Sequence, residues 1–328
     1  MRAPEFWTGN GLGAQLARAA LAPLGWGYGA TVVWKTARAD PYRSKAKVIC
    51  VGNLTVGGSG KTPVAIALAR VLTERRQKPV ILTRGYGGRI RGPAIVHPQS
   101  DSALDVGDEA LVLASAAPVI VARDRAAGAK LAESLGADVI VMDDGHQNFS
   151  LAKDLSLVIV DSETGFGNGH MLPAGPLREP VGRGLTRADA IVTVGSGQPA
   201  LPHVEKPVLR AHIVPVDVLR LEDRPVVAFA GIERPEKFFA TLRKLGAEIA
   251  DAQAFPDHHV YSHGELEQLR NMARIIRAVL VTTEKDFVRL TLAQRQNIRY
   301  LPVRAAFEDP AALAALLDRV APRAPVSA

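Results

Sequence analysis

Short apolar runs alternate with longer helical stretches along most of this 328-residue chain. The apolar runs predict buried strands, and the stretches between them predict helices. The repeated order of strand, helix and strand predicts an α/β fold built on a mostly parallel sheet flanked by helices. The strands predicted in this part of the chain are 48–51, 79–83, 118–121, 139–142, 155–160, 188–194 and 208–214.

The alternation breaks near residues 219–225 and then starts again as a second, shorter α/β run. The strands expected in this run are 226–230, 278–282 and 299–303, with a helix at 235–245. The predicted organisation is an N-terminal segment (1–35), a core domain (36–220), a smaller α/β domain (221–320) and a Pro/Ala-rich tail expected to be disordered (321–328).

Residues 11–34 form an unusually apolar segment whose only charge is Arg18. The segment is long enough to span a bilayer, but five glycines and Pro23 interrupt it. A basic cluster follows that suits the anionic cytoplasmic leaflet of a membrane: Lys35, Arg38, Arg43, Lys45 and Lys47. We favour an N-terminal helix that lies in the membrane interface. A true membrane span and a helix packed on the protein's own core are the alternatives.

The overall charge and the cysteine count restrict the partners further. The net charge of +7 and the pI near 9.7 admit acidic partners such as nucleotides and phospholipid surfaces. Only nine Phe, five Tyr and three Trp are present, so the aromatic and basic platform typical of single-stranded nucleic-acid binding is not indicated. The single cysteine, Cys50, excludes an intramolecular disulfide and a cysteine-rich metal site. We expect Cys50 to be a buried thiol in a cytoplasmic protein.

Residues 48–63 contain the strand, glycine-rich loop and helix start that a phosphate-binding loop (P-loop) requires. Backbone N–H groups of such a loop cradle phosphate, Lys61 reaches the β- and γ-phosphates, and Thr62 binds Mg²⁺. The residues expected to hold the nucleotide are Val56, Gly57, Gly58, Ser59, Gly60, Lys61 and Thr62. Thr55 departs from the strict pattern, which has glycine at that position. A glycine-rich turn with a surface lysine is the alternative.

Charged residues also follow the ends of other predicted strands, where sheets of this kind collect their ligands. They are Arg84, Arg123, Asp143 and Asp144. The two aspartates resemble a Walker B element, which holds Mg²⁺ directly or through water, although a pair of acidic turn residues is the alternative. The basic loop 84–89 could hold phosphates or a lipid head group, or it could be a plain solvated turn. Asp108, at the start of a helix, is a candidate base for an acceptor hydroxyl.

Residues 165–180 form a long loop with four glycines and three prolines. Loops of this length are usually functional or disordered, and Phe166, Met171 and Leu172 argue against disorder. Arg178 could clamp a phosphate with two hydrogen bonds, or it could be an ordinary surface arginine. His258 and His259 are adjacent in a later loop, which is a weak metal signal without nearby cysteines.

A P-loop with Mg²⁺ ligands is shared by small-molecule kinases, GTPase switches and membrane-cycling ATPases. Guanine-binding proteins often carry an [NT]-K-x-D motif, and this chain has Glu284 where the lysine belongs. A GTPase is therefore less favoured. A membrane-associated ATPase of the partitioning type and a lipid-transport or scaffold protein that binds nucleotide structurally stand as alternatives to a kinase.

Several motifs occur together in an order that resembles the tetraacyldisaccharide 4'-kinase family of lipid A biosynthesis. They are the P-loop with its Thr55, Thr83–Gly87, Gly107–Glu109, Asp143–Gly145, Gly167–Gly169, Leu172–Glu179, Phe255–His258 and Thr283–Asp286. The resemblance implies transfer of the γ-phosphate of ATP to the 4'-hydroxyl of a tetraacylated glucosamine disaccharide 1-phosphate, which forms lipid IVA. It also implies work at the cytoplasmic face of the inner membrane of a Gram-negative bacterium, with the bilayer surface and the acylated disaccharide as partners.

The resemblance also implies roles for individual residues. Asp108 would be the general base, tuned by His258, and Lys61 would act on the phosphates. Thr62, Glu109 and Asp143 or Asp144 would serve Mg²⁺. Arg123, Gln147, Arg178 and Glu179 would line the site. Together with Arg84 of the basic loop 84–89, they are the residues expected around the substrate. One departure concerns the run after Asp144, which reads Gly145-His146-Gln147-Asn148 where the family usually has Gly-Phe-Gln-His.

Overall fold

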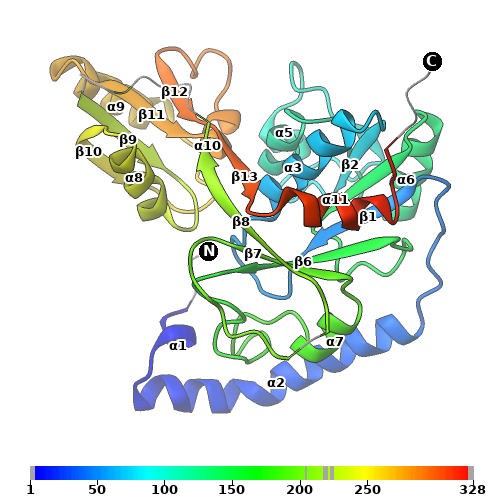
Figure 1. The fold of residues 1–328 in the computed structure, drawn as a ribbon. Coiled ribbons are helices and arrows are strands. Elements are labelled where there is room, and N and C mark those ends of the chain that lie inside the picture. Colours follow the sequence, from blue (N-terminus) through cyan, green and yellow to red (C-terminus); the bar gives the residue numbers. More distant parts are fainter. Residues whose placement is uncertain (1–3, 204, 217–220, 222–224, 324–328) are drawn as a thin grey trace.

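A nine-stranded sheet forms the centre of the computed structural model, which describes residues 4–203, 205–216, 221 and 225–323 (Figure 1). Its strand order is β13-β8-β7-β6-β1-β5-β2-β4-β3, and all pairs are parallel except β13–β8 and β3–β4. The strands are β1 (Lys47–Gly52), β2 (Pro79–Thr83), β3 (Ala94–Ile95), β4 (Val119–Val121), β5 (Val139–Asp143), β6 (Leu155–Asp161), β7 (Ala190–Val194), β8 (Val208–Pro215) and β13 (Val303–Phe307).

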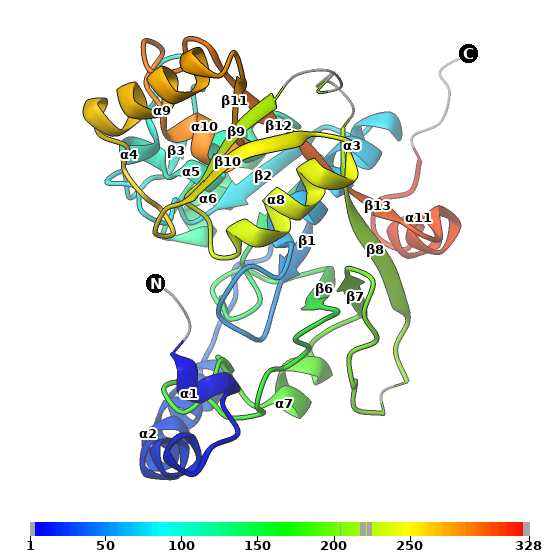
Figure 2. The ribbon, with the colours of Figure 1, turned by 90° about the vertical axis from the view of Figure 1, so that its left-hand side faces the viewer.

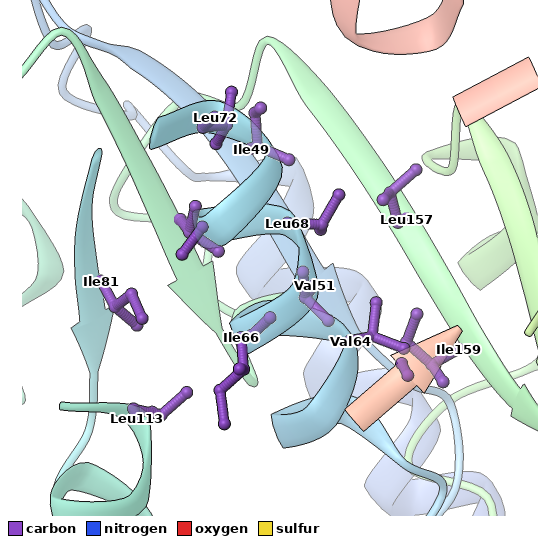
Figure 3. Packing of buried hydrophobic residues seen from close by; sticks show 14 of the residues in the cluster. Ile49, Val51, Val64, Ile66, Leu68, Leu72, Ile81, Leu113, Leu157 and Ile159 are labelled. Atoms are coloured by element: carbon purple, nitrogen blue, oxygen red, sulfur yellow. The ribbon is translucent and has the colours of Figure 1, made fainter. Parts of the chain in front are cut away.

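Helices cover both faces of this sheet, which is why its central strands read as continuous apolar runs rather than alternating ones. One face packs against α3 (Lys61–Glu74), α5 (Asp108–Leu113) and α11 (Pro310–Asp318). Figure 3 shows Leu68 and Leu72 of α3 lying over Ile49 and Val51 of β1. The other face packs against α6 (Arg125–Ser134) and, further along, α7 (Val181–Thr186). The short helix α4 (Ala103–Val106) precedes α5.

A second sheet of four parallel strands lies beside the first, with the order β10-β9-β11-β12. Its strands are β9 (Pro225–Ala230), β10 (Glu248–Ala254), β11 (Val279–Thr283) and β12 (Ile298–Leu301). Helix α8 (Pro235–Lys244) packs on one face through Phe238 and Leu242, and α9 (His263–Ile275) packs on the other through Leu266. The short helix α10 (Glu284–Arg289) follows β11 directly and contacts α5 of the large sheet.

The chain returns to the nine-stranded sheet after β12, which the sequence pattern did not indicate. Residues 299–303 were expected to form one strand of the smaller unit, but Pro302, which has no N–H to donate, separates β12 from β13. β13 then pairs antiparallel with β8, and α11 packs on the large core. The C-terminal part of the predicted 221–320 unit therefore belongs to the other sheet. Most of the predicted boundary at 219–225 and the tail from 324 onward lie outside the described residues.

Two N-terminal helices, α1 (Glu5–Thr8) and α2 (Leu12–Ala37), run along the edge of the molecule opposite the four-stranded sheet (Figures 1 and 2). Only Gly25 and Gly29 of α2 are buried, against Met171 of the loop that contains residues 165–180. The large apolar side chains of α2 that stay exposed are Leu12, Leu16, Leu24, Trp26, Tyr28 and Trp34. Among the described residues, no helix combines the length and apolar character needed to cross a membrane.

Candidate active site

The P-loop has the strand, loop and helix order that the sequence predicts. β1 ends at Gly52, and α3 begins at Lys61 with Gly60 as its N-cap. Gly57 (φ 109°) and Gly60 (φ 87°) adopt backbone angles that side chains rarely tolerate, so the loop can turn toward the start of α3. This start carries free N–H groups and the positive end of a 14-residue helix, which together attract phosphate.

Asp144 lies close to the P-loop lysine because β5 pairs with β1, with Asp143 opposite Val51. The Asp144 carboxylate is 3.5 Å from Lys61 Nζ and accepts two hydrogen bonds from Arg178 Nη1, at 2.9 and 3.1 Å. Burial opposes ionisation of this carboxyl, but the charges of Lys61 and Arg178 outweigh it and lower its pKa to about 2. Lys61, Asp144 and Arg178, which the sequence predicted as site residues, therefore meet at the Asp144 carboxylate.

Asp143 is completely buried beside them, and its Oδ1 atom has no hydrogen-bond partner. Burial, together with the charges of Glu109 and Asp144, raises the pKa of Asp143 to about 7. A buried, unpartnered carboxylate oxygen among other acids is stabilised by a cation, because its ionised form needs an opposite charge. In the described part of the chain, no three Asp, Glu, His or Cys side chains form a metal site by themselves. This donor set suits Mg²⁺, which usually takes one or two carboxylates together with waters and substrate phosphates.

Asp108 begins α5 and connects the two sheets. Its Oδ2 atom is 2.9 Å from Nδ1 of His258 and 2.6 Å from Nη2 of Arg289, both of which belong to the four-stranded unit. Its Oδ1 atom accepts a hydrogen bond from the Glu109 N–H. Burial alone would raise its pKa, but the His258 hydrogen bond and the charges of Lys285 and Arg289 hold the pKa of this carboxyl well below its usual range.

Arg289 and Lys285, both on α10, are residues that sequence reasoning did not single out. Arg289 is 6% exposed, and its Nη1 atom donates to the carbonyl of Gly231 and to Asp286, each at 2.7 Å. Lys285 pairs with Glu109 at 3.2 Å. The Thr283–Asp286 motif was noted in the sequence, yet which of its neighbours reach the other sheet depends on long-range packing. The sequence feature that could have indicated these two residues is the charged helix turn directly after the buried strand β11.

The substrate residues expected from the resemblance fall into two groups. Gln147 and Glu179 meet beneath the P-loop, where Gln147 Nε2 donates to Glu179 (2.9 Å) and to the carbonyl of Asn53 (2.8 Å). Glu179 is 1% exposed and also pairs with Arg187 at 2.6 Å, so it positions its neighbours. Arg84 and Arg123 are exposed just after β2 and β4, and no hydrogen bond or ion pair of their side chains occurs within the described residues. Both are therefore available to a ligand.

His146 and Asn148, the two residues that depart from the family's usual sequence, have structural roles in this chain. His146 is 1% exposed, with Nδ1 3.1 Å from Ser156 Oγ and Nε2 2.9 Å from the Gly184 carbonyl. Burial and the charge of Lys153 lower its pKa to about 3, so the ring is neutral near pH 7. His146 thus joins β6 to α7 and does not exchange protons with the site. Asn148 accepts hydrogen bonds from the N–H and hydroxyl of Ser150.

Two further sequence interpretations concern Cys50 and His259. Cys50 is fully buried in β1, as expected, and burial raises the pKa of its thiol. His259 turns away from Asp108: its ring stacks on Phe255 at 4.9 Å and its Nε2 atom is 3.0 Å from Glu265. The two adjacent histidines therefore do not face one common ligand.

Comparison with known proteins identifies the family. A family model described as Tetraacyldisaccharide-1-P 4'-kinase matches residues 17–321. The chain belongs to this family. A tetraacyldisaccharide 4'-kinase of Rhodospirillum rubrum is 48% identical and covers 98% of both chains, and one of Gluconacetobacter diazotrophicus is 49% identical over 97% of this chain and 98% of its own length.

A solved structure supports the same assignment. The "apo" form of LpxK from Aquifex aeolicus, in complex with ATP, matches with a TM-score of 0.76 and 28% identity, covering 93% of this chain and 99% of that one. The α/β fold with a mostly parallel sheet and the resemblance drawn from the motifs are thereby confirmed. Membership of the tetraacyldisaccharide-1-P 4'-kinase family makes this chain an ATP-binding kinase of lipid A biosynthesis, and the partitioning ATPase is not favoured.

Proposed function

We propose that the chain transfers the γ-phosphate of ATP to the 4'-hydroxyl of a tetraacylated glucosamine disaccharide 1-phosphate, and that it does so between the two sheets. The observation that carries this proposal is the convergence of three elements. The P-loop meets the acidic end of β5 at Lys61 and Asp144, and the Asp108–His258 pair at 2.9 Å adjoins Glu109, whose charge acts on Asp143. The P-loop can hold the donor and Asp108 can receive the proton of the acceptor. The match of the chain to 4'-kinases along its length supports the choice of acceptor.

The donor phosphates are held by the P-loop, from Val56 to Thr62. Its backbone N–H groups and the start of α3 stabilise negative charge, and Lys61 moves from Asp144 to the β- and γ-phosphates. Phosphoryl transfer depends mainly on positioning and on neutralising the equatorial oxygens, so these groups supply most of the required stabilisation.

Mg²⁺ is the cofactor that the acidic cluster fits. We assign Thr62, Asp143 and Asp144 to hold the ion, with Glu109 beside them. The unpartnered Oδ1 atom of Asp143 and its raised pKa support this assignment. When bound, the ion neutralises charge on the phosphate oxygens.

Asp108 accepts the proton of the 4'-hydroxyl, while His258 and Arg289 hold its carboxylate in place. The depressed pKa keeps this carboxylate ionised near pH 7, so that it can accept a proton. Arg178, Gln147 and Glu179 shape the floor of the site through Asp144 and Asn53. Arg84 and Arg123 offer exposed guanidinium groups for the 1-phosphate of the lipid.

The acyl chains of the acceptor remain in the bilayer, so the enzyme works at the membrane surface. We assign this contact to α2, which presents exposed Trp26 and Trp34 beside the basic residues Lys35 and Arg38. A cavity of about 270 Å³ lies between α2 and the loop around Met171, and its lining is mostly apolar. We place the protein at the cytoplasmic face of the inner membrane, as a peripheral or monotopic protein, because ATP is supplied from the cytoplasm.

Replacing Trp26 and Trp34 by glutamate should weaken binding to vesicles that contain anionic phospholipid. Each change removes a large apolar side chain and adds a repelling charge, so we expect the partition coefficient to fall about tenfold for each. ATP binding should be unchanged, because α2 does not contact the P-loop. Leu292→Glu, at a leucine that is 75% exposed on the four-stranded unit, is the matched control. Equal sedimentation of all variants with vesicles would refute the role of α2.

Mass spectrometry of the lipid product tests the proposed reaction. Purified enzyme, Mg-ATP and tetraacyldisaccharide 1-phosphate in detergent micelles should yield a lipid heavier by one phosphate group, attached at the 4' position. A deacylated disaccharide is the matched control for the acyl requirement. An unchanged lipid after complete consumption of ATP would reject the proposal.

A further inference from the structure

The carboxylate of Glu233 lies on the P-loop. Glu233 belongs to the turn between β9 and α8 of the four-stranded sheet, and its Oε2 atom accepts a hydrogen bond from the backbone N–H of Gly58. A methyl group on Gly57 would come within 2.7 Å of Glu233 Oε1, and one on Gly58 within 3.1 Å of Oε2. The carboxylate therefore sits directly over the glycines that the P-loop uses to approach phosphate.

Ion pairs of the neighbouring side chains Arg234 and Lys237 hold this turn against the nine-stranded sheet. Arg234 Nη2 is 2.7 Å from Asp161 Oδ2 at the end of β6 and donates to the carbonyl of Gly58 at 3.2 Å. Lys237 extends the contact to Glu163, at 2.7 Å. Gly58 is thus held on both sides, with its N–H on an acid and its carbonyl on a base from consecutive residues of the same turn.

A carboxylate and a phosphate compete for the same backbone N–H groups at this position. Both are anions whose oxygens accept hydrogen bonds from the P-loop N–H groups, and two such anions repel each other at contact distance. Two side chains of the loop also have protein partners: Lys61 pairs with Asp144, and the Ser59 hydroxyl accepts from Asn53 at 3.0 Å. Glu233 therefore adds a third internal contact to the loop, at the Gly58 N–H, which a bound phosphate would otherwise use.

We propose that Glu233 occupies a phosphate position of the nucleotide-free P-loop and sets the affinity for ATP, because the nucleotide must displace it. This proposal rests on the proposed function, since it concerns the same ATP site. Displacement removes the contact between Glu233 and Gly58, which is one of those that join the two sheets, while Arg234 and Lys237 keep their partners Asp161 and Glu163. Glu233 is an affinity-determining residue and takes no part in the transfer itself.

Titration calorimetry with ATP and with inorganic pyrophosphate tests the proposal. Glu233→Gln keeps the size of the side chain but removes its charge, so we expect the dissociation constants of ATP and pyrophosphate to fall about tenfold. The same change should appear with both probes, because the contact is with the phosphate loop and not with the adenosine site. Glu233→Asp keeps the charge on a shorter side chain, so its dissociation constants should lie between those of the wild type and those of Glu233→Gln.

Glu236→Gln is the matched control. Glu236 lies three residues further on, at the exposed start of α8, and carries the same charge without a P-loop contact in the described structure. Its variant should bind both probes like the wild type. Equal or weaker binding of ATP by Glu233→Gln, in an enzyme that still transfers phosphate, would overturn this inference alone. Absence of ATP binding by every variant and by the wild type would overturn the proposed function with it.

Discussion

Asp108→Asn is expected to lower kcat by at least about 100-fold, with ATP binding close to that of the wild type. The amide keeps the shape of the side chain but cannot take up the proton of the acceptor hydroxyl. It also replaces a charge that now compensates Arg289, whose guanidinium is 6% exposed. The measurement is a steady-state transfer assay with the acylated acceptor, combined with ATP titration.

Asp251→Asn, on the edge strand β10, is the control for loss of a carboxylate elsewhere in the chain. Its kcat should match the wild type. If Asp108→Asn turned over at nearly the normal rate, Asp108 could not be the general base, and its contacts with His258 and Arg289 would be structural only.

Lys61→Ala is expected to lower kcat by roughly 1,000-fold, because it removes a preorganised positive charge from the position where negative charge develops. The Lys61 side chain is 13% exposed and lies 3.5 Å from Asp144, so its charge acts in a largely dehydrated site. Loss of this charge also leaves Asp144 with Arg178 as its remaining close cation. ATP affinity should weaken together with kcat, which distinguishes this variant from Asp108→Asn.

Lys244→Ala, at the exposed end of α8, removes a lysine without touching the P-loop and should behave like the wild type. A Lys61→Ala enzyme with wild-type kcat and ATP affinity would mean that the P-loop does not hold the reacting phosphates.

The parts of the site that the sequence predicted are those that are local in the chain. β1, the P-loop and α3 are consecutive, and the glycines at 57 and 60 have the positive φ angles that such a loop needs. Asp143 and Asp144 follow a buried strand, and adjacent parallel strands place them beside Lys61. Apolar periodicity and motif spacing are enough to predict these positions, because no contact between distant residues has to be known.

The parts that escaped prediction depend on contacts between distant residues. Arg289 reaches Asp108 across 181 positions of sequence, and Glu233 reaches Gly58 across 175. Neither pair has a local pattern, since a single charged residue in a turn or short helix reads as solvated surface. The pairing of β13 with β8 is non-local in the same way. His258 was proposed from family resemblance, because a histidine in a loop does not by itself indicate which carboxylate it faces.

The partition of labelled phosphate between lipid and water distinguishes transfer to the lipid from simple hydrolysis of ATP. Wild-type enzyme is incubated with γ-labelled ATP, Mg²⁺ and tetraacyldisaccharide 1-phosphate in micelles, and the organic and aqueous phases are then counted. Label is expected to enter the lipid in step with the ADP formed. Release of all label as inorganic phosphate, with unlabelled lipid, would contradict it and indicate an ATPase.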